Sequence, residues 1–216
     1  MHTFLASKYA KAVVLLLGLG PLAAIIWPFW RGYIIPNPLE FIQHATGDWA
    51  LRFLLITLTI SPLRKLVRLP ELIRFRRMLG LFAFFYACLH FTTYLWFDKV
   101  FDVHEIWKDV YKRPFITVGF TAFVLLIPLA LTSTKGWIRR LGGKRWQALH
   151  RLIYVSAIAG VVHYWWLVKA DISKPAEYAF VLSLLLGYRL VLGLLRSTRE
   201  RKSESLSARS AEVTEV

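Results

Sequence analysis

The chain has 216 residues, of which 56% are hydrophobic and 15% are aromatic, and its mean hydropathy is +0.48. A soluble domain of this length is rarely so apolar, so the composition indicates an integral membrane protein. The net charge of +15 is compatible with a nucleic-acid partner, but the distribution of that charge along the chain favours membrane topology instead.

The apolar segments predict an all-α bundle of six transmembrane helices. A spanning helix needs about 20 mostly apolar residues, because the hydrocarbon core is about 30 Å thick. Six segments reach or approach this length, roughly 12–30, 49–63, 78–97, 115–132, 147–168 and 178–195. The second segment is short and carries Arg52 near one end. We count it because its flanks are charged and a helix satisfies its own backbone groups in lipid.

The first apolar segment follows Lys8 and Lys11, as a cleaved signal peptide would. Its apolar run is long and ends in "WPFW" rather than in a small-residue cleavage site, so an uncleaved first span is favoured. We therefore predict a cytoplasmic N-terminus over 1–11, a membrane domain over 12–195 and a polar, disordered cytoplasmic tail over 196–216.

The basic residues are concentrated in alternate loops. Segments 64–77 and 133–145 hold six and five Lys or Arg, with one acid and none. In the other loops the basic residues are balanced or outnumbered by acids. Loop 31–48 has one Lys or Arg and two acids, loop 98–113 has four of each, and loop 169–177 has two of each. The positive-inside rule then places both termini and the even-numbered loops in the cytoplasm. The basic excess also favours anionic lipid headgroups.

Histidines inside apolar segments are the main functional signal. Ionisable groups at membrane depth are costly, so they indicate function by default. His2 lies at the terminus and is uninformative. For His44 and His104, in outer loops, a solvated or interfacial role is favoured over ligation. The remaining three lie in predicted spans: His90, His150 and His163.

Two of these histidines are predicted at matching depth. His90 lies 13 residues past Arg77, and His163 lies 13 residues past His150, which is about 20 Å along a helix. Because both helices run outward, His90 and His163 fall in the outer half of the membrane. His150 falls near the inner edge.

Two histidines at equal depth on different helices can bind one haem iron from opposite sides. The alternative is a pair of buried histidines that bond to Ser, Thr or backbone groups of neighbouring helices. Three intramembrane histidines, two of them matched in depth, favour haem. Zinc would require clustered ligands, and no HxxH or HxxxH pattern occurs.

The spacing between His150 and His163 limits this interpretation. Thirteen residues turn an ideal helix so that the two side chains lie about 140° apart. The two rings therefore need not face the same neighbour, or the helix is irregular.

Ordered sequence blocks carry a family resemblance over about 40–195. The blocks "IQHATG", "ALRFLLITLTISPLRKL", "RRMLGLFAFFYACLH", "RPFITVG", "LTST" and "WQALHRLIYVSAIAGVVHYWW" resemble the MsrQ family of haem-binding membrane subunits. That family belongs to the ferric-reductase-like transmembrane group, together with the NADPH oxidases.

The resemblance implies a six-helix cytochrome b, with haem b, in the bacterial inner membrane. Such a subunit takes electrons from the respiratory quinone pool. It passes them to MsrP, a periplasmic molybdopterin enzyme that reduces methionine sulfoxide in oxidised proteins. The family is also associated with FMN. Its intramembrane histidines fall on His90, His150 and His163 of this sequence.

The chain departs from the wider group at the inner edge. NADPH oxidases carry two histidines fourteen residues apart on the third helix, whereas Arg76 lies fourteen residues before His90 here. His150 therefore lacks an obvious histidine partner, and it either holds an inner haem with another ligand or serves a quinone or flavin site. The soluble flavin and nicotinamide domain of the wider group is absent, so the electron donor is expected to be a separate molecule.

These observations lead to the hypothesis of an electron relay from an inner centre near His150 to an outer haem held by His90 and His163. Three arginines lie near the inner edge: Arg76, Arg77 and Arg151. They can pair haem propionates, a quinone oxygen or an FMN phosphate, although a role in setting the membrane topology alone is favoured. Arg52 can pair an outer propionate or extend to the interface.

Three rival functions remain open. One is a ferric-reductase-like cytochrome b with another acceptor, such as ferric iron. A second is a haem-free transporter or channel gated by histidine protonation, and a third is a structural anchor for a periplasmic enzyme. We find no nucleophile–base pair or molybdenum ligand in the sequence, which favours an electron-transfer subunit over a complete enzyme.

Overall fold

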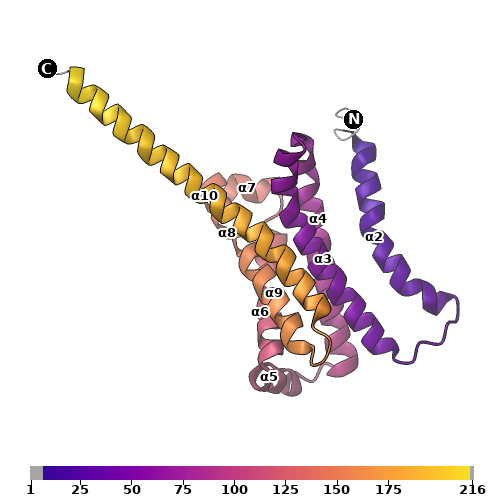
Figure 1. The fold of residues 1–216 in the computed structure, drawn as a ribbon. Coiled ribbons are helices and arrows are strands. Elements are labelled where there is room, and N and C mark those ends of the chain that lie inside the picture. Colours follow the sequence, from indigo (N-terminus) through magenta and orange to yellow (C-terminus); the bar gives the residue numbers. More distant parts are fainter. Residues whose placement is uncertain (1–6, 215–216) are drawn as a thin grey trace.

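The computed structural model describes residues 7–214, and every regular element in that range is helical (Figure 1). Six helices run along the length of the molecule: α2 (Lys8–Trp30), α3 (Pro38–Leu66), α4 (Ile73–Thr93), α6 (Pro114–Leu131), α9 (Leu152–Leu167) and α10 (Ser173–Thr214). Shorter elements connect them: η1 (Pro70–Leu72), the π-helical turn η2 (Tyr94–Asp98), α5 (Val103–Lys112), α7 (Lys135–Leu141) and α8 (Gly143–His150).

Side-chain caps fix where several helices begin. The Ser7 hydroxyl accepts a hydrogen bond from the N–H of Ala10 at the start of α2. The Asn37 side chain caps α3, where Pro38 occupies the first turn, a position at which no intrahelical donor is needed. Asp102 accepts from two backbone N–H groups at the start of α5. These local signals set the bounds of the helices that surround the site.

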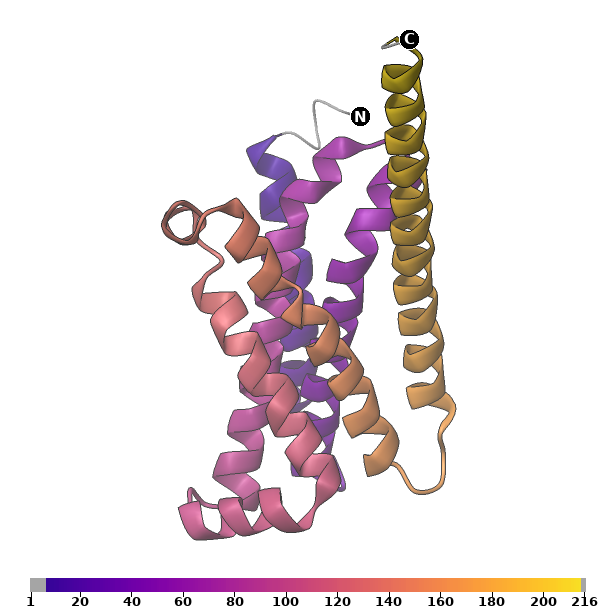
Figure 2. The ribbon, with the colours of Figure 1, turned by 90° about the vertical axis from the view of Figure 1, so that its left-hand side faces the viewer.

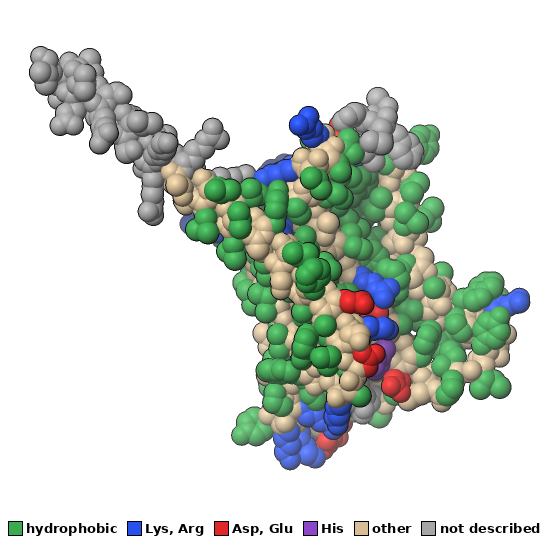
Figure 3. All heavy atoms as spheres, viewed as in Figure 1, with side chains coloured by type: hydrophobic (Ala, Val, Ile, Leu, Met, Phe, Trp, Pro, Cys, Tyr) green, Lys and Arg blue, Asp and Glu red, His purple; other side chains and the backbone are tan. Residues whose placement is uncertain are grey.

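Within residues 7–214, four helical stretches are long and apolar enough to cross a membrane. They are Lys8–Trp30, Pro70–Phe97, Pro114–Leu131 and Ser173–Leu195. Hydrophobic side chains also cover most of the face shown in Figure 3, as expected of a surface in contact with lipid. The chain is therefore a multi-pass membrane protein.

The other two predicted spans correspond to α3 and to α8 with α9, which do not meet the same measure. Helix α3 has 29 residues but carries Asp48 and Arg52 in its apolar part. Helix α9 has only 16 residues, because the helix is interrupted at Arg151. The six-span count therefore stays a prediction.

The bundle has two distinct ends. Helix α2 begins and α10 ends at the end where α7 lies, and α5 lies across the opposite end (Figures 1 and 2). Helix α3 packs most extensively on α4, and α6 on α9. In the core, the buried Tyr86 hydroxyl donates to the Gly18 carbonyl and accepts from the Leu22 N–H, both at 2.9 Å, which attaches α2 to α4.

The end of the chain differs from the sequence-based expectation. We expected a disordered tail over 196–216, whereas α10 continues to Thr214. The segment beyond Ser197 is free of proline and glycine, and Glu, Arg, Ala, Leu and Lys, which have good helix propensity, make up eleven of its nineteen residues. Residues 1–6 of the predicted N-terminal segment and residues 215–216 of the tail lie outside the described residues.

Candidate functional site

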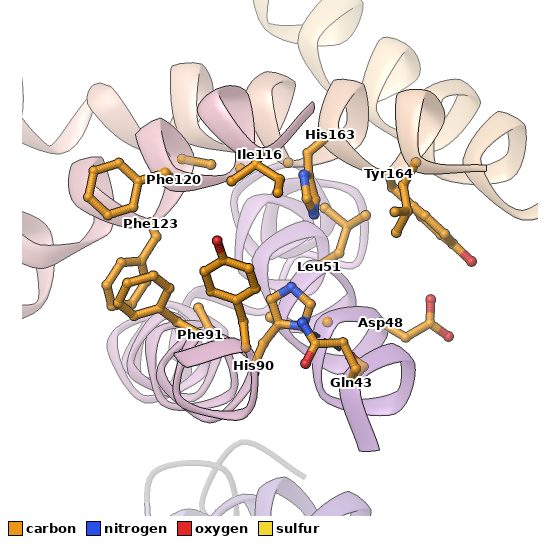
Figure 4. A pocket seen from close by; sticks show the side chains of 18 of the residues that line it. Gln43, Asp48, Leu51, His90, Phe91, Ile116, Phe120, Phe123, His163 and Tyr164 are labelled. Atoms are coloured by element: carbon orange, nitrogen blue, oxygen red, sulfur yellow. Dashed lines mark hydrogen bonds between the residues drawn. The ribbon is translucent and has the colours of Figure 1, made fainter. Parts of the chain in front are cut away.

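A cavity of about 600 Å³ lies between α3, α4, α6 and α9, toward the end of the bundle where α5 lies. Its size falls within the range of roughly 300–1,000 Å³ that is usual for small-molecule and cofactor sites. Most of the side chains that line it are apolar or aromatic, including Leu51, Phe91, Phe120 and Phe123 (Figure 4). Such a lining excludes water from a bound group.

His90 and His163 point into this cavity from different helices (Figure 4). The centres of the two imidazole rings are 6.2 Å apart, and the ring planes are 76° apart. The prediction that these two histidines lie at the same level of the bundle is thereby confirmed. Their juxtaposition is long-range in sequence and depends on the packing of α4 and α9 around α3 and α6.

Backbone carbonyls hold both rings in one orientation. Nδ1 of His90 lies 2.9 Å from the carbonyl oxygen of Gln43 on α3, and Nδ1 of His163 lies 2.7 Å from that of Phe115 on α6. A carbonyl only accepts, so Nδ1 carries the hydrogen in each neutral ring. Nε2 then keeps its lone pair, and this is the tautomer that a metal-ligating histidine needs.

Two glycines give these imidazoles room. A Cβ atom added to Gly47 would lie 3.0 Å from the His90 ring, and one added to Gly119 would lie 2.5 Å from Nδ1 of His163. Each glycine lies four residues after the carbonyl acceptor on the same helix, which is one helical turn. Helices α3 and α6 therefore use the same device, a carbonyl acceptor followed one turn later by a glycine against which the ring rests.

The geometry fits a haem with two axial imidazoles. A metal–imidazole bond is about 2 Å long, so two rings that ligate one iron from opposite sides have centres about 6 Å apart. Within the described part of the chain, no group of three or more His, Cys, Asp or Glu is placed to hold a metal ion. Two facing imidazoles suit a haem, whose macrocycle supplies the other ligands, better than a zinc ion, which takes four.

His150 lies away from this cavity, at the end of α8. Its ring stacks on Trp146 with ring centres 3.8 Å apart, and its Nδ1 lies 3.0 Å from the Trp146 carbonyl. Its Nε2 is buried near the Leu129 backbone but makes no hydrogen bond of ordinary geometry to the described residues. The structure thus pairs two of the three predicted histidines and leaves the third at a separate place.

The segment that carries His150 and His163 is an irregular helix. This was one of the two alternatives left open by the spacing of thirteen residues between these histidines. The N–H of Arg151 donates to the carbonyl of Ala148, and the N–H of Tyr154 donates to the carbonyl of Arg151, at 3.1 and 3.0 Å. These i to i+3 bonds separate α8 from α9 and change the direction of the chain. The ideal-helix angle of about 140° between His150 and His163 therefore does not apply.

A polar network borders the cavity between α3 and α10. Arg52 donates to the Asp48 carboxylate and to the Tyr178 hydroxyl, and the Tyr178 hydroxyl donates to Asp48, each at 2.9 Å. The sequence led us to consider a propionate or the interface as the partner of Arg52, but its partners in the structure are Asp48 and Tyr178. We identified neither residue from the sequence. Tyr178 is 126 residues from Arg52, whereas Asp48 lies one helical turn before Arg52, and that i, i+4 spacing was a usable signal.

Helix α5 covers the outer end of the cavity through Ile106, Val110 and Arg113. Asp109 on this helix is buried and pairs with Lys99 at 2.5 Å and with Arg113 at 3.5 Å. Burial alone would raise the pKa of Asp109, but the hydrogen bond and charge of Lys99, together with Arg113, outweigh it and lower the pKa. These ion pairs fix α5 to the end of α4 and the start of α6.

The two outer-loop histidines are consistent with the solvated or interfacial roles favoured from the sequence. His104 is exposed on α5, where its backbone N–H donates to the Asp102 cap. The His44 side chain is 53% exposed and lies 4.0 Å from Glu40, although His44 also forms part of the cavity lining. Neither is placed opposite another histidine as His90 is.

Comparison with known proteins agrees with this fold and site. Residues 46–161 match the family described as ferric reductase like transmembrane component, so the class is that of ferric-reductase-like membrane proteins. The protein-methionine-sulfoxide reductase heme-binding subunit MsrQ of Herminiimonas arsenicoxydans is 64% identical over 156 residues, which are 71% of this chain and 72% of the relative.

Two further relatives with the same name cover more of the chain. MsrQ of Xanthomonas campestris pv. campestris (strain 8004) is 52% identical over 84% of this chain and 85% of its own. MsrQ of Azospira oryzae is 54% identical over 84% of this chain and 78% of its own. The chain therefore belongs to the MsrQ family.

Proposed function

We propose that this chain is a haem b electron-transfer subunit of the bacterial inner membrane, which relays electrons from the quinone pool to the periplasmic molybdopterin reductase MsrP. Through MsrP it would support the repair of oxidised periplasmic proteins. The observation that carries the proposal is the pair of facing imidazoles, His90 and His163, each fixed by a backbone carbonyl. The names of the relatives, which describe haem-binding subunits of a methionine-sulfoxide reductase, point in the same direction.

His90 and His163 would hold the haem in the cavity through Nε2. A bound haem b supplies the one-electron redox chemistry, and the protein sets its ligands, burial and orientation. Gln43 and Phe115 keep Nε2 of each ring unprotonated by accepting from Nδ1. Gly47 and Gly119 leave the space in which the rings stand, and the apolar lining excludes water.

The membrane arrangement in this proposal has six spans. Four are the helical stretches that are long and apolar enough to cross a membrane, and the other two are α3 and the α8–α9 pair. Both termini and the basic segments 64–77 and 133–145 then lie on the cytoplasmic side. The cavity and α5 lie toward the periplasm, where MsrP would receive electrons. Electron transfer across the membrane is thus the part of the reaction assigned to this chain, and sulfoxide reduction is assigned to MsrP.

His150 marks the inner centre of the proposed relay. Its buried Nε2 makes no hydrogen bond of ordinary geometry to the described residues, as expected of a nitrogen that serves a bound group. The inner group is either a second haem with another ligand or a quinone or flavin. FMN is carried over from the family resemblance, and we assign no residue to it.

A two-step transfer assay on the purified chain in detergent tests the proposal. A short-chain quinol is added without oxygen and the b-type absorption is followed, and oxidised MsrP with methionine sulfoxide is added next. We expect reduction by the quinol and reoxidation that requires MsrP. The His163→Ala variant should show neither step.

Two results would contradict the proposed function. Reoxidation by ferric citrate as fast as by MsrP would assign the chain to another acceptor. Wild-type protein that is prepared with added haem and yet retains none would return the chain to the transporter hypothesis.

A further inference from the structure

Three arginines meet near the end of the bundle where α7 lies, away from the histidine cavity. Arg64 is in the last turn of α3, Arg76 is in the first turns of α4, and Arg189 lies on α10. All three side chains are only partly exposed. None of the three forms an ion pair with a described carboxylate, and Glu71 on η1 is the one acid between Arg64 and Arg76 in the chain. Positive charge is therefore in excess here.

Two hydrogen bonds, together with the position of Arg64 itself, place the three arginines along one face of α3. Arg189 donates to the Leu58 carbonyl at 2.6 Å, and Arg76 donates to the Ser61 hydroxyl at 3.4 Å. Leu58, Ser61 and Arg64 follow one another at a spacing of three residues, so they lie on the same side of the helix. The three cations therefore share about two helical turns of α3.

The surroundings of the cluster leave a net positive charge. The Arg189 guanidinium lies 5.2 Å from the centre of the Tyr154 ring, which adds α9 to the site. Nε of Arg64 is buried and has no hydrogen-bond partner among the described residues. The C-terminal end of α3 favours a cation at Arg64 through the helix dipole, but it supplies no acceptor to Nε. Buried cations in proteins are normally paired, so an anion is the missing component.

The neighbouring surface is apolar. Leu190 and Leu194, one and five residues after Arg189 on α10, are 68% and 67% exposed, and Leu66, two residues after Arg64 on α3, is 82% exposed. A ligand that reaches the arginines therefore lies beside exposed hydrocarbon side chains. This combination of a cationic cluster and an apolar border suits an amphiphile better than a soluble anion. Basic sites between membrane helices are known to bind anionic lipid headgroups.

We propose that Arg64, Arg76 and Arg189 form a binding site for the phosphate of an anionic phospholipid, whose acyl chains lie along the exposed apolar face of α10. Arginine suits this role because its planar group of donors matches phosphate oxygens. The bound lipid would also join α10 to α3 and α4, since its phosphate contacts all three helices. The site rests on the membrane character of the chain and is independent of the haem relay.

Native mass spectrometry of the detergent-purified chain, stripped of lipid and titrated with cardiolipin, tests the proposal. We expect Arg64→Gln and Arg76→Gln each to weaken cardiolipin binding about tenfold, the effect of one lost hydrogen bond to a charged group. Arg64→Gln is the sharpest variant, because the Arg64 side chain makes no hydrogen bond to the described residues and its removal breaks none. Lys65→Gln and Arg77→Gln are matched controls on the same helices, at exposed positions, and should change binding less than about twofold.

Two outcomes would overturn the proposal. Equal weakening in all four variants would mean general attraction between lipid and basic protein rather than a site. Displacement of cardiolipin by millimolar inorganic phosphate or FMN would assign the arginines to a soluble phosphate. Haem content does not enter this readout, so failure of the electron relay would leave the result interpretable.

Discussion

The two ends of the bundle solve the problem of buried polar groups in different ways. At the α5 end, His90 and His163 face each other, and the chain itself supplies the carbonyls and glycines that orient them. At the α7 end, Nε2 of His150 and Nε of Arg64 are buried without hydrogen-bond partners among the described residues. The chain thus supplies the partners of both imidazoles at the α5 end, whereas two buried nitrogens at the α7 end have none among the described residues.

This difference explains why one centre can be assigned to residues and the other cannot. A bis-histidine site needs two imidazoles at one level, and the structure provides them only between α4 and α9 within the described residues. At the α7 end, no second described histidine lies opposite His150, and Arg76 lies on α4 fourteen residues before His90. The arginines at that end favour anionic ligands over a metal ion.

The largest expected effect on the histidine pair comes from filling the space beside His163. Gly119→Ala places a Cβ 2.5 Å from Nδ1, so the ring must move away from the Phe115 carbonyl. We expect haem retention to fall about tenfold, the equivalent of about 1.4 kcal/mol. Gly47→Ala, with a contact of 3.0 Å to the His90 ring, should have a smaller effect, measured as haem per chain after purification.

Gly20→Ala is the control for these two variants, because a Cβ at Gly20 meets nothing within 4 Å. Haem loss of the same size in Gly20→Ala would mean that the glycines act through general stability. Equal haem retention in all three variants would contradict the close packing of Gly47 and Gly119 against the His90 and His163 rings.

The closure of the outer cavity should depend on Asp109. Asp109→Asn removes the carboxylate that pairs with Lys99 and Arg113, and losing a hydrogen bond to a charged group costs about 1.5–3 kcal/mol. We expect faster hydrogen exchange of α5 and a lower thermal midpoint, with no change at the α7 end. Glu105→Gln removes an exposed pair with Lys108 on the same helix and should cost less than about 1 kcal/mol. Similar effects of the two variants would refute a closing role for Asp109.

A smaller effect is expected at the network between α3 and α10. Tyr178→Phe removes one hydrogen bond to Asp48 and one from Arg52, which should destabilise the protein by about 1–2 kcal/mol. Thermal unfolding in detergent measures this change. Tyr188→Phe, on the same helix and without a hydrogen-bonded hydroxyl among the described residues, should be near neutral. A neutral Tyr178→Phe would show that the network does not hold α10.

The smallest effect is the pH dependence of α5. The pKa of Asp109 is lowered below its ordinary value of 3.8, so its ion pairs contribute fully above that value and are lost as the pH falls through the lowered pKa. Protection of α5 from proteolysis should be equal at pH 7 and pH 5 and should fall only in stronger acid. Loss of protection between pH 7 and pH 5 would contradict this assignment.

Several features of the outer site could be predicted from the sequence because they follow from helix geometry. A rise of about 1.5 Å per residue was enough to place His90 and His163 at one level. The carbonyls of Gln43 and Phe115 could not be predicted, because a backbone acceptor carries no residue-type signal and lies 47 and 48 residues from its histidine. A usable signal was present nonetheless, since the blocks "IQHATG" and "RPFITVG" both end in the glycine on which the ring rests.

The inner end was less predictable for a physical reason. The interruption at Arg151 occurs without proline or an adjacent glycine, so no local breaker marked it. Arg189 was not identified because its partners, Leu58 and Tyr154, belong to other helices. The helical tail up to Thr214 was missed because its polar composition was taken as a sign of disorder, although its residues also have good helix propensity.

The most direct test is a reduced-minus-oxidised visible spectrum of the purified protein, with haem quantified per chain, for the wild type and for His90→Ala, His150→Ala and His163→Ala. The proposal predicts b-type bands in the wild type that are lost in His90→Ala and His163→Ala. Signal that persists in His150→Ala would belong to the outer centre alone. A spectrum that all three substitutions leave unchanged, or the absence of haem from carefully prepared wild type, would contradict the bis-histidine site.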